Sequence, residues 1–561
     1  MYFNSVPQNA TSEKKSVSSK ATWFKYLPWK SAHRYRSGSS GGHDGAASGS
    51  KGHKGKKRRL SLQPSPAYMQ TSKEYWMEYC RNTSLHGLQY VGEQNRPMSE
   101  RLFWIFAFTF CIILSFCYIA KVWEKWNDSP VIVSFSDKST RIWEIPFPAV
   151  TICSEIKVNQ TLFNYTATAL SNNRSDEQSE HLEYSSLVCN SRYSGLNHTN
   201  ERALEYIGKV APKLEEVIKN CKWREEMKNC SNLFSSVLTD DGLCYTFNTL
   251  AARDLLTSIT VTRYLNVSSD SQDWDPESGY IDGDSPMTYP HRALTSGSGA
   301  GLSIELHADY KFIDPLCRRP VHGFKMVLHN PAEFPQVQHQ FFRVPLDREV
   351  VVGVKPSAIV TTEGLRSYTP ERRQCFFSNE RKLRFFRFYT QDNCEFECLS
   401  NHTLHHCGCL AYYMPRTENS TICGAGSNGC IKKAAELLYN NKDMVAHCNC
   451  QPACSEIRYD VEISHAALGW ETKSSVGIVS IYFKDKQFIT SQRSELYGTT
   501  DFLANCGGLL GLFLGFSILS LVELVYFFTL RLCCNIRRAK LRLAKRMKEI
   551  ETSRKIHEIL F

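Results

Sequence analysis

The sequence predicts a two-span α-helical membrane protein with a large α+β, disulfide-rich domain between the spans. Three observations support this fold class. Two long apolar windows lie far apart in the chain, basic residues gather at both of its ends, and 16 of the 22 cysteines fall between Cys153 and Cys454. A chain of 561 residues is long enough to build one large folded unit or several smaller ones.

The first apolar window runs from Leu102 to Ala120 and contains no charged residue. At ~1.5 Å per residue, a helix of this length nearly crosses a hydrocarbon core of ~30 Å. We therefore expect the first transmembrane helix at residues 101–122, after a cytosolic region at residues 1–100. Residues 1–70 of that region are rich in glycine, serine and lysine, a composition that predicts disorder.

The second apolar window, residues 509–530, carries a single charge, Glu523. We expect a second transmembrane helix at residues 501–530, followed by a basic cytosolic tail at residues 531–561. Residues 1–100 hold 16 Lys and Arg against 6 Asp and Glu, and the tail holds 10 against 3. Because basic flanks stay on the cytosolic side, both termini are predicted to be cytosolic.

The segment between the spans, residues 123–500, is then predicted to be extracellular. Its even number of cysteines fits a disulfide framework in an oxidising compartment. Eight N-x-S/T sequons there are candidate glycosylation sites: Asn159, Asn164, Asn173, Asn197, Asn229, Asn266, Asn401 and Asn419. Residue alternation and β-branched content predict strands at residues 301–307, 323–329, 350–354 and 476–483. Helical periodicity predicts helices at residues 203–219 and 431–439.

The second span carries the clearest functional pattern. Gly507, Gly511 and Gly515 recur every fourth residue, so they share one helical face. Ordinary close packing of helices would explain such a pattern alone. Glu523 near the same face adds an ionisable group, which indicates either a water-filled path or a side chain that snorkels to the inner interface. Asp501 at the outer end would add negative field where cations enter.

A pore needs oxygen atoms that replace the water around a cation. A break in the helix at Gly515-Phe516-Ser517 could offer backbone carbonyls and the Ser517 hydroxyl. Two helices per chain cannot enclose a pore, so several subunits must contribute, and symmetry turns Glu523 into a ring of carboxylates. A metal or catalytic site is not predicted: no nucleophile–base pair or phosphate loop stands out.

Residues 511–523, GLFLGFSILSLVE, resemble the pore signature of the epithelial sodium channel/degenerin family, in which G-x-S forms the narrow sodium-selective belt. Other segments that resemble family motifs are His86-Gly87 (the cytosolic gating motif), FPAVTIC at 147–153, CYTFN at 244–248 and CGCLAYYMP at 407–415. The composition around RQCFF at 373–377 is most like the insect pickpocket branch. The resemblance implies a trimeric channel whose extracellular part has a β-rich palm with helical finger and thumb.

The resemblance also implies roles for single residues. Gly511 matches the position associated with amiloride block, and Ala504 matches the position where added bulk props related channels open. Phe516 departs from relatives that carry a small residue in G-x-S, and Arg372 replaces a Trp that couples thumb to membrane in acid-sensing relatives. The implied disulfides are Cys153–Cys244, Cys221–Cys230, Cys375–Cys454, Cys394–Cys450, Cys398–Cys448, Cys407–Cys430 and Cys409–Cys423, which leaves Cys189–Cys317 as an eighth pair.

We therefore expect a subunit of a sodium-permeable, amiloride-sensitive, gated cation channel of the plasma membrane with a sensory or epithelial role. Its expected partners are two further channel subunits and the lipid bilayer. No cofactor is expected beside the permeant Na⁺, no nucleic acid partner is expected, and the chain is not expected to be an enzyme. Two alternatives remain: an ATP-gated type of trimeric channel, and a non-conducting receptor or adhesion subunit. A zinc site at His405, His406, Cys407 and Cys409 is weighed against disulfides, which an oxidising exterior favours.

Overall fold

The computed structural model describes residues 67–128, 131–189, 195–261, 264–265, 274–280, 288–318, 321–469 and 475–559. The chain divides into two units, Met1–Thr71 and Ser72–Phe561, and apart from the first residues of α1 the elements discussed below belong to the second. Residues 1–66 and Asn266 lie outside the described residues. The prediction of disorder for residues 1–66 and that one sequon therefore lie outside the described part of the chain, whereas residues 67–70, included in the same prediction, begin the helix α1.

Among the described residues, two helical segments are long and apolar enough to cross a membrane, Met98–Asp128 and Ile518–Lys555, and Thr499–Leu514 is a shorter apolar helix. The first is α3, Met98–Asp128, which extends beyond the predicted span at both ends and buries only Ser115 among its own residues. The second apolar window is divided into α14, Thr499–Leu514, and α15, Ile518–Tyr526. A five-residue π-helix, η6 (Phe527–Arg531), joins α15 to the basic helix α16, Leu532–Ile559. Before the first span lie α1, Ala67–Asn82, and α2, Leu88–Gly92.

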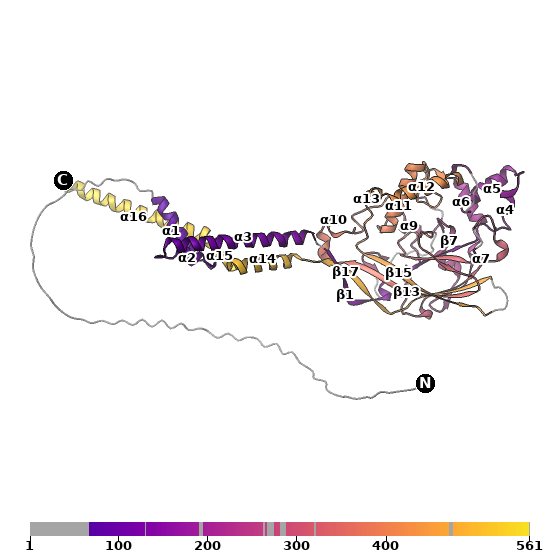
Figure 1. Ribbon diagram of the computed structural model, residues 1–561, viewed down its shortest axis with the longest axis horizontal. Coiled ribbons are helices and arrows are strands. Elements are labelled where there is room, and N and C mark those ends of the chain that lie inside the picture. Colours follow the sequence, from indigo (N-terminus) through magenta and orange to yellow (C-terminus); the bar gives the residue numbers. More distant parts are fainter. Residues whose placement is uncertain are drawn as a thin grey trace, which may run out of the picture. The chain divides into compact units, whose positions relative to one another are not determined.

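We call the part of the chain between the two spans, residues 131–495, the inter-span domain. It contains an eight-stranded sheet that includes the strands next to both spans. The strand order is β1-β17-β13-β16-β10-β4-β5, and β15 pairs with β13. The strands are β1 Val131–Arg141, β4 Ile218–Trp223, β5 Glu226–Met227, β10 Leu302–His307, β13 Arg348–Thr361, β15 Glu456–Ala467, β16 Val476–Phe483 and β17 Gln487–Glu495. Because β1 follows α3 and β17 precedes α14, this antiparallel pair of strands is joined through the chain to both spans (Figure 1).

A second sheet of five strands has the order β12-β11-β2-β7-β6. Its strands are β2 Ala149–Ser154, β6 Phe234–Thr239, β7 Gly242–Phe247, β11 Phe324–His329 and β12 Phe342–Val344. The two sheets share one hydrophobic core, in which Phe147, Trp223, Phe247 and Phe483 pack edge to face or tilted. The predicted strands at 301–307, 323–329, 350–354 and 476–483 correspond to β10, β11, part of β13 and β16.

Helices lie around these sheets (Figure 1). They are α4 Tyr165–Leu170, α5 Asp176–Ser186, α6 Glu201–Val210, α7 Leu214–Val217, α8 Cys230–Leu233, α9 Ala252–Leu255, α10 Pro370–Arg373, α11 Gln391–Cys407, α12 Asn428–Asn440 and α13 Lys442–Cys448. The 3₁₀ turns are η1 Ile142–Glu144, η2 Ser298–Ala300, η3 Tyr310–Phe312, η4 Glu363–Ser367 and η5 Ala425–Ser427, and the short paired strands are β3 His198–Thr199, β8 Trp274–Asp275, β9 Gly279–Tyr280 and β14 Ile422–Cys423.

The helix predicted at residues 203–219 is wrong in its second half. The chain leaves α6 at Val210, forms the short α7 after Pro212, and enters β4 at Ile218. Proline lacks the backbone N–H and disfavours helical geometry in the residue before it, which explains the interruption. The 431–439 helix lies within α12.

Eight disulfides tie the inter-span domain together, and they join the same pairs that the family resemblance implies, with Cys189–Cys317 as the eighth. Five of them lie between Cys375 and Cys454 and fix the helices α11, α12 and α13. Cys407 and Cys409 are both oxidised, so neither offers the thiolate that the zinc alternative required.

Candidate pore and gate

The second span is broken where the sequence places Gly515-Phe516-Ser517. Gly515 has a left-handed backbone (φ +64°), a conformation that glycine adopts without steric cost. Its N–H donates to the Gly511 carbonyl at 2.9 Å, which closes α14. Ser517 then starts α15, because its hydroxyl accepts a hydrogen bond from the Ser520 N–H at 3.2 Å. The break therefore follows from a glycine stop and a serine start only two residues apart.

The His86-Gly87 pair lies directly against this break. The His86 N–H donates to the Leu514 carbonyl at 3.0 Å, which satisfies one of the acceptors that the end of α14 leaves free. A Cβ added to Gly515 would lie 2.7 Å from atoms of the His86 ring, so a larger residue would require this ring to move. Gly87 also has positive φ (+82°), and its Cα faces the Trp104 ring of the first span. The segment is thus held between the two spans.

Glu523, about one and a half turns from the start of α15, contacts the segment that contains His86. Its Oε2 accepts hydrogen bonds from the Ser84 N–H and the Ser84 hydroxyl, each at 3.0 Å. The Ser84 hydroxyl also lies 2.7 Å from that of Ser520. The carboxylate therefore has protein partners from a segment 439 residues away in sequence. The two hydrogen bonds from Ser84 fix the position of the carboxylate.

Among the described residues, nothing lies close to the two outer glycines of α14. A Cβ added to Gly507 or Gly508 would meet nothing within 4 Å, and one added to Gly511 would meet only the Phe516 carbonyl, at 3.8 Å. The opposite contacts go to α3, where Tyr118 stacks on Phe513 with ring centroids 5.9 Å apart. α14 therefore packs on the first span with one side, and its glycine side is free to contact helices of further chains.

Two further predicted positions lie near the outer end of α14. Ala504 is exposed and belongs to the open part of the helix. Asp501 is also exposed, and its Oδ2 accepts a hydrogen bond from the Gly498 N–H at 3.1 Å. This contact caps the first turn of α14, where a carboxylate also interacts favourably with the helix dipole. Phe516 is half-buried at the break itself.

Arg372 contacts the first span through two interactions. Its guanidinium carbon lies 4.2 Å from the ring centroid of Trp126, and its Nη2 donates to the Trp126 carbonyl at 2.9 Å. Trp126 in turn contacts Phe502 of α14, with ring centroids 5.6 Å apart. Arg372 lies in α10, three residues before the disulfide at Cys375. Sequence reasoning identified this residue only as a departure from relatives and did not predict its contact.

Two polar contacts hold the inner end of the second span beside α1. The Tyr75 hydroxyl donates to the Phe527 carbonyl, and Arg531 forms an ion pair with Glu78. Phe527 and Arg531 are the first and last residues of the π-helix η6, a form that widens the helix and frees its normal backbone pairing. Local sequence does not predict these two contacts, because they join residues that are 452 and 453 positions apart.

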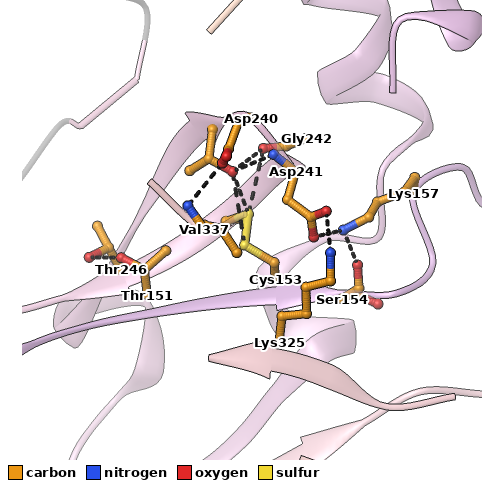
Figure 2. The surroundings of a disulfide bond; sticks show 12 residues. Thr151, Cys153, Ser154, Lys157, Asp240, Asp241, Gly242, Thr246, Lys325 and Val337 are labelled. Atoms are coloured by element: carbon orange, nitrogen blue, oxygen red, sulfur yellow. Dashed lines mark hydrogen bonds and ion pairs between the residues drawn. A yellow bond between two sulfur atoms is a disulfide. The ribbon is translucent and has the colours of Figure 1, made fainter. Parts of the chain in front are cut away.

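A buried ionic cluster lies inside the inter-span domain (Figure 2). The Asp241 carboxylate, 0% exposed, lies 2.5 Å from Lys157 Nζ, 2.7 Å from Lys325 Nζ and 3.3 Å from Arg318 Nη2. Burial alone would raise the pKa of Asp241, but these three cations lower that pKa to about 2. Asp241 follows β6 in the turn that leads to Cys244, so the cluster lies beside the Cys153–Cys244 disulfide, as Figure 2 shows.

The described sequons differ in exposure. Asn164, Asn173, Asn197, Asn229, Asn401 and Asn419 are exposed. Asn159 is only 4% exposed, and its Oδ1 accepts hydrogen bonds from the N–H and hydroxyl of Thr161 at 3.0 and 2.8 Å. Its side chain therefore lacks the free surface that the other six share.

Comparisons with known proteins agree with this arrangement. A family model described as "Amiloride-sensitive sodium channel" matches residues 79–527. Pickpocket protein 28 of Drosophila melanogaster is 31% identical over 508 residues, which cover 84% of this chain and 81% of that protein. Sodium channel protein Nach of the same species is 22% identical over 84% of this chain and 89% of its own length. Human acid-sensing ion channel 2 is also 22% identical, over 83% of this chain and 86% of its own. These descriptions name ion channels.

Proposed function

The chain belongs to the amiloride-sensitive sodium channel family and is a cation channel subunit, and from that premise we propose that its channel is gated, sodium-permeable and amiloride-sensitive. The observation that carries the proposal is the broken second span. Gly515 and Ser517 interrupt the helix, His86 lies against the interruption, and Glu523 follows it on α15. Cations that cross here would meet backbone oxygens first and a ring of carboxylates next.

Three chains, identical or mixed, would form the channel, with two further subunits beside this one. The open glycine side of α14 supports this assembly, because no atom of the described residues lies within 4 Å of a Cβ added to Gly507 or Gly508. We assign this side to the symmetry axis, where the small residues allow the three helices to approach closely. The channel would lie in the plasma membrane with both termini cytosolic, as the basic flanks favour.

The proposal of amiloride sensitivity is supported by the resemblance of Gly511, one helical turn before the break, to the position associated with amiloride block in the family. Sodium selectivity rests on the narrow belt at Gly515 to Ser517. The half-buried side chain of Phe516 leaves the belt oxygens to the backbone and to Ser517. A sensory or epithelial role is consistent with a channel that has a large inter-span domain. The stimulus would act on that domain and reach the spans through the β1–β17 pair and the Arg372–Trp126 contact.

The test is expression of the full chain in oocytes or cultured cells, with current recording in sodium and in potassium solutions. We expect an inward current that is larger in sodium and is reduced by amiloride. The Ala504→Val variant provides a standing current when the stimulus is unknown. A surface-expressed Ala504→Val chain that carries no current, either alone or with related subunits, would overturn the proposal in favour of a non-conducting receptor.

A further inference from the structure

Two adjacent cysteines, Cys533 and Cys534, lie in the first turn of α16, directly after the second span. Both are exposed, and neither takes part in a disulfide. The other free cysteines of the described residues have different surroundings. Cys80 is fully buried, Cys111 and Cys117 lie in α3 within the first apolar window, and Cys506 lies in α14.

The position of the two cysteines relative to the membrane follows from the contacts of η6. Arg531 forms its ion pair with Glu78 on α1, and these charged groups require a place outside the hydrocarbon core. Cys533 follows Arg531 by two residues, which is less than one helical turn of ~5.4 Å. The thiols therefore lie at the level where the apolar window ends and polar contacts begin.

Apolar and basic side chains meet at these thiols. Leu530, Leu532 and Ile536 are 63%, 39% and 50% exposed, so the apolar surface of the span continues past both cysteines. Arg537, Arg538 and Lys540 follow within two turns. Exposed apolar residues favour insertion into the acyl region of a bilayer, and the basic residues favour anionic headgroups. The surface suits a lipid chain attached at its centre.

We propose that Cys533 and Cys534 are sites of reversible S-acylation by a long-chain fatty acid. In this step a cysteine thiolate attacks the carbonyl carbon of a long-chain acyl-coenzyme A bound to a membrane acyltransferase. A thioester bond to the cysteine forms as the thioester bond to coenzyme A breaks, and the cysteine's proton ends on the departing coenzyme A thiol. Hydrolysis of the new thioester returns the free cysteine and a fatty acid. The proposal rests on the cytosolic placement of α16 in the proposed function.

The consequence for the channel is mechanical. α16 continues α15 through η6, so its direction is linked to the segment that carries Glu523. An acyl chain at Cys533 or Cys534 holds the first turn of α16 at the membrane surface. When the acyl chain is removed, only the exposed apolar and basic side chains anchor this turn. Acylation therefore restrains the inner end of the second span.

The experiment uses full-length chain in cells that are fed an alkyne-tagged palmitate analogue, with detection by click chemistry after immunoprecipitation. We expect label that hydroxylamine removes, because hydroxylamine cleaves thioesters. The double variant Cys533→Ser/Cys534→Ser should lose at least nine-tenths of the label. The matched control Cys111→Ser/Cys117→Ser changes two free cysteines at bilayer depth and should keep it. Surface biotinylation of each variant confirms that it has folded.

Label that persists in the Cys533→Ser/Cys534→Ser variant, or wild-type chain that takes up no label, would overturn the inference. Failure of the proposed function has different signs. A labelled chain that carries no current contradicts the channel assignment and leaves the acylation intact. Modification of Cys534 in the Cys533→Ser variant by a membrane-impermeant maleimide, added outside intact cells, would overturn the cytosolic placement and the acylation together.

Discussion

The guanidinium of Arg372 lies over the indole of Trp126, with its carbon 4.2 Å from the ring centroid, and donates a hydrogen bond to the Trp126 backbone carbonyl. This contact joins α10, next to the Cys375–Cys454 disulfide, to the outer end of the first span. Tyr368 lies on the guanidinium as well, at 4.4 Å. The Arg372 side chain thus links the inter-span domain to the first membrane helix, because a guanidinium can stack on a ring and donate a hydrogen bond at the same time.

Loss of the Arg372 side chain should weaken the link between the inter-span domain and the spans. We expect Arg372→Ala and Trp126→Ala, made separately and together in the Ala504→Val background, to show a coupling energy of ~0.5–1 kcal/mol. This corresponds to about a two- to fivefold change in the open-to-closed ratio of the standing current. Arg366→Ala, which removes a similar stacking contact on Phe377, is the control and should show no coupling to Trp126.

Gly515 should tolerate no side chain. In Gly515→Ala the new Cβ would meet the His86 ring at 2.7 Å and would also occupy a left-handed backbone, which costs ~1–2 kcal/mol. We expect the current per surface channel to fall at least tenfold. Gly507→Ala is the matched control, because its Cβ meets no atom of the described residues within 4 Å, and it should reduce the current less. Equal losses in the two variants would contradict a special role for the His86 contact.

Added volume at Ala504 should favour the open channel. Ala504 lies on the exposed part of α14 that we assign to the symmetry axis, where a larger residue would resist the approach of three helices. Ala504→Val should give a larger standing inward current than wild type, and amiloride should reduce it. Leu503→Ile, one residue earlier, keeps the side-chain volume and should behave as wild type. An unchanged current in surface-expressed Ala504→Val would argue against this gate.

Glu523 should raise the local concentration of cations in the pore. Glu523→Gln keeps the shape and can still accept from Ser84, but it removes the charge. We expect lower single-channel conductance, with the largest difference in solutions of low ionic strength, where screening is weak. Glu124→Gln on α3 removes one exposed carboxylate outside the second span and should leave conductance within experimental error. A salt-independent effect of Glu523→Gln would indicate a structural role.

Acid should destabilise the inter-span domain through Asp241. Its pKa of about 2 lies below the ~3.9 of an unfolded chain, so its contribution to stability is complete above pH ~4 and is lost as the pH falls toward 2. The shift corresponds to roughly 2–3 kcal/mol. We expect the melting temperature of the purified protein to fall over this interval.

Asp241→Asn should already lower the melting temperature at neutral pH, because it leaves the cationic neighbours of Asp241 without a counter-charge. We expect a lower melting temperature at pH 7, from a loss of roughly 3–5 kcal/mol, and a weaker dependence on pH between 4 and 2. Asp460→Asn, at an exposed position, is the control and should match wild type at both ends of the range. Poor surface expression of Asp241→Asn alone would agree with the prediction, whereas a wild-type melting temperature at pH 7 would contradict it.

Some features of this protein follow from local sequence alone. The apolar windows determine the spans because length and absence of charge are sufficient to identify a membrane helix. The interruption at Gly515 and Ser517 can also be predicted locally, because a glycine that ends a helix and a serine that caps the next one act on their immediate neighbours. Alternating residues likewise predicted β10, β11 and β16, since strand burial repeats every second residue.

Other features exist only in the folded chain. The contacts of Ser84 with Glu523, of Arg372 with Trp126 and of Lys157 with Asp241 join residues that are 439, 246 and 84 positions apart. Each partner taken alone is an ordinary polar residue, and Asp241 in particular lies in a turn where sequence favours exposed polar groups. Periodicity and composition carry no information about which distant residues meet, because the two sheets and the eight disulfides bring them together. The sequence determined where the membrane is crossed and where the crossing helix breaks, whereas the tertiary structure decided what lies against the break.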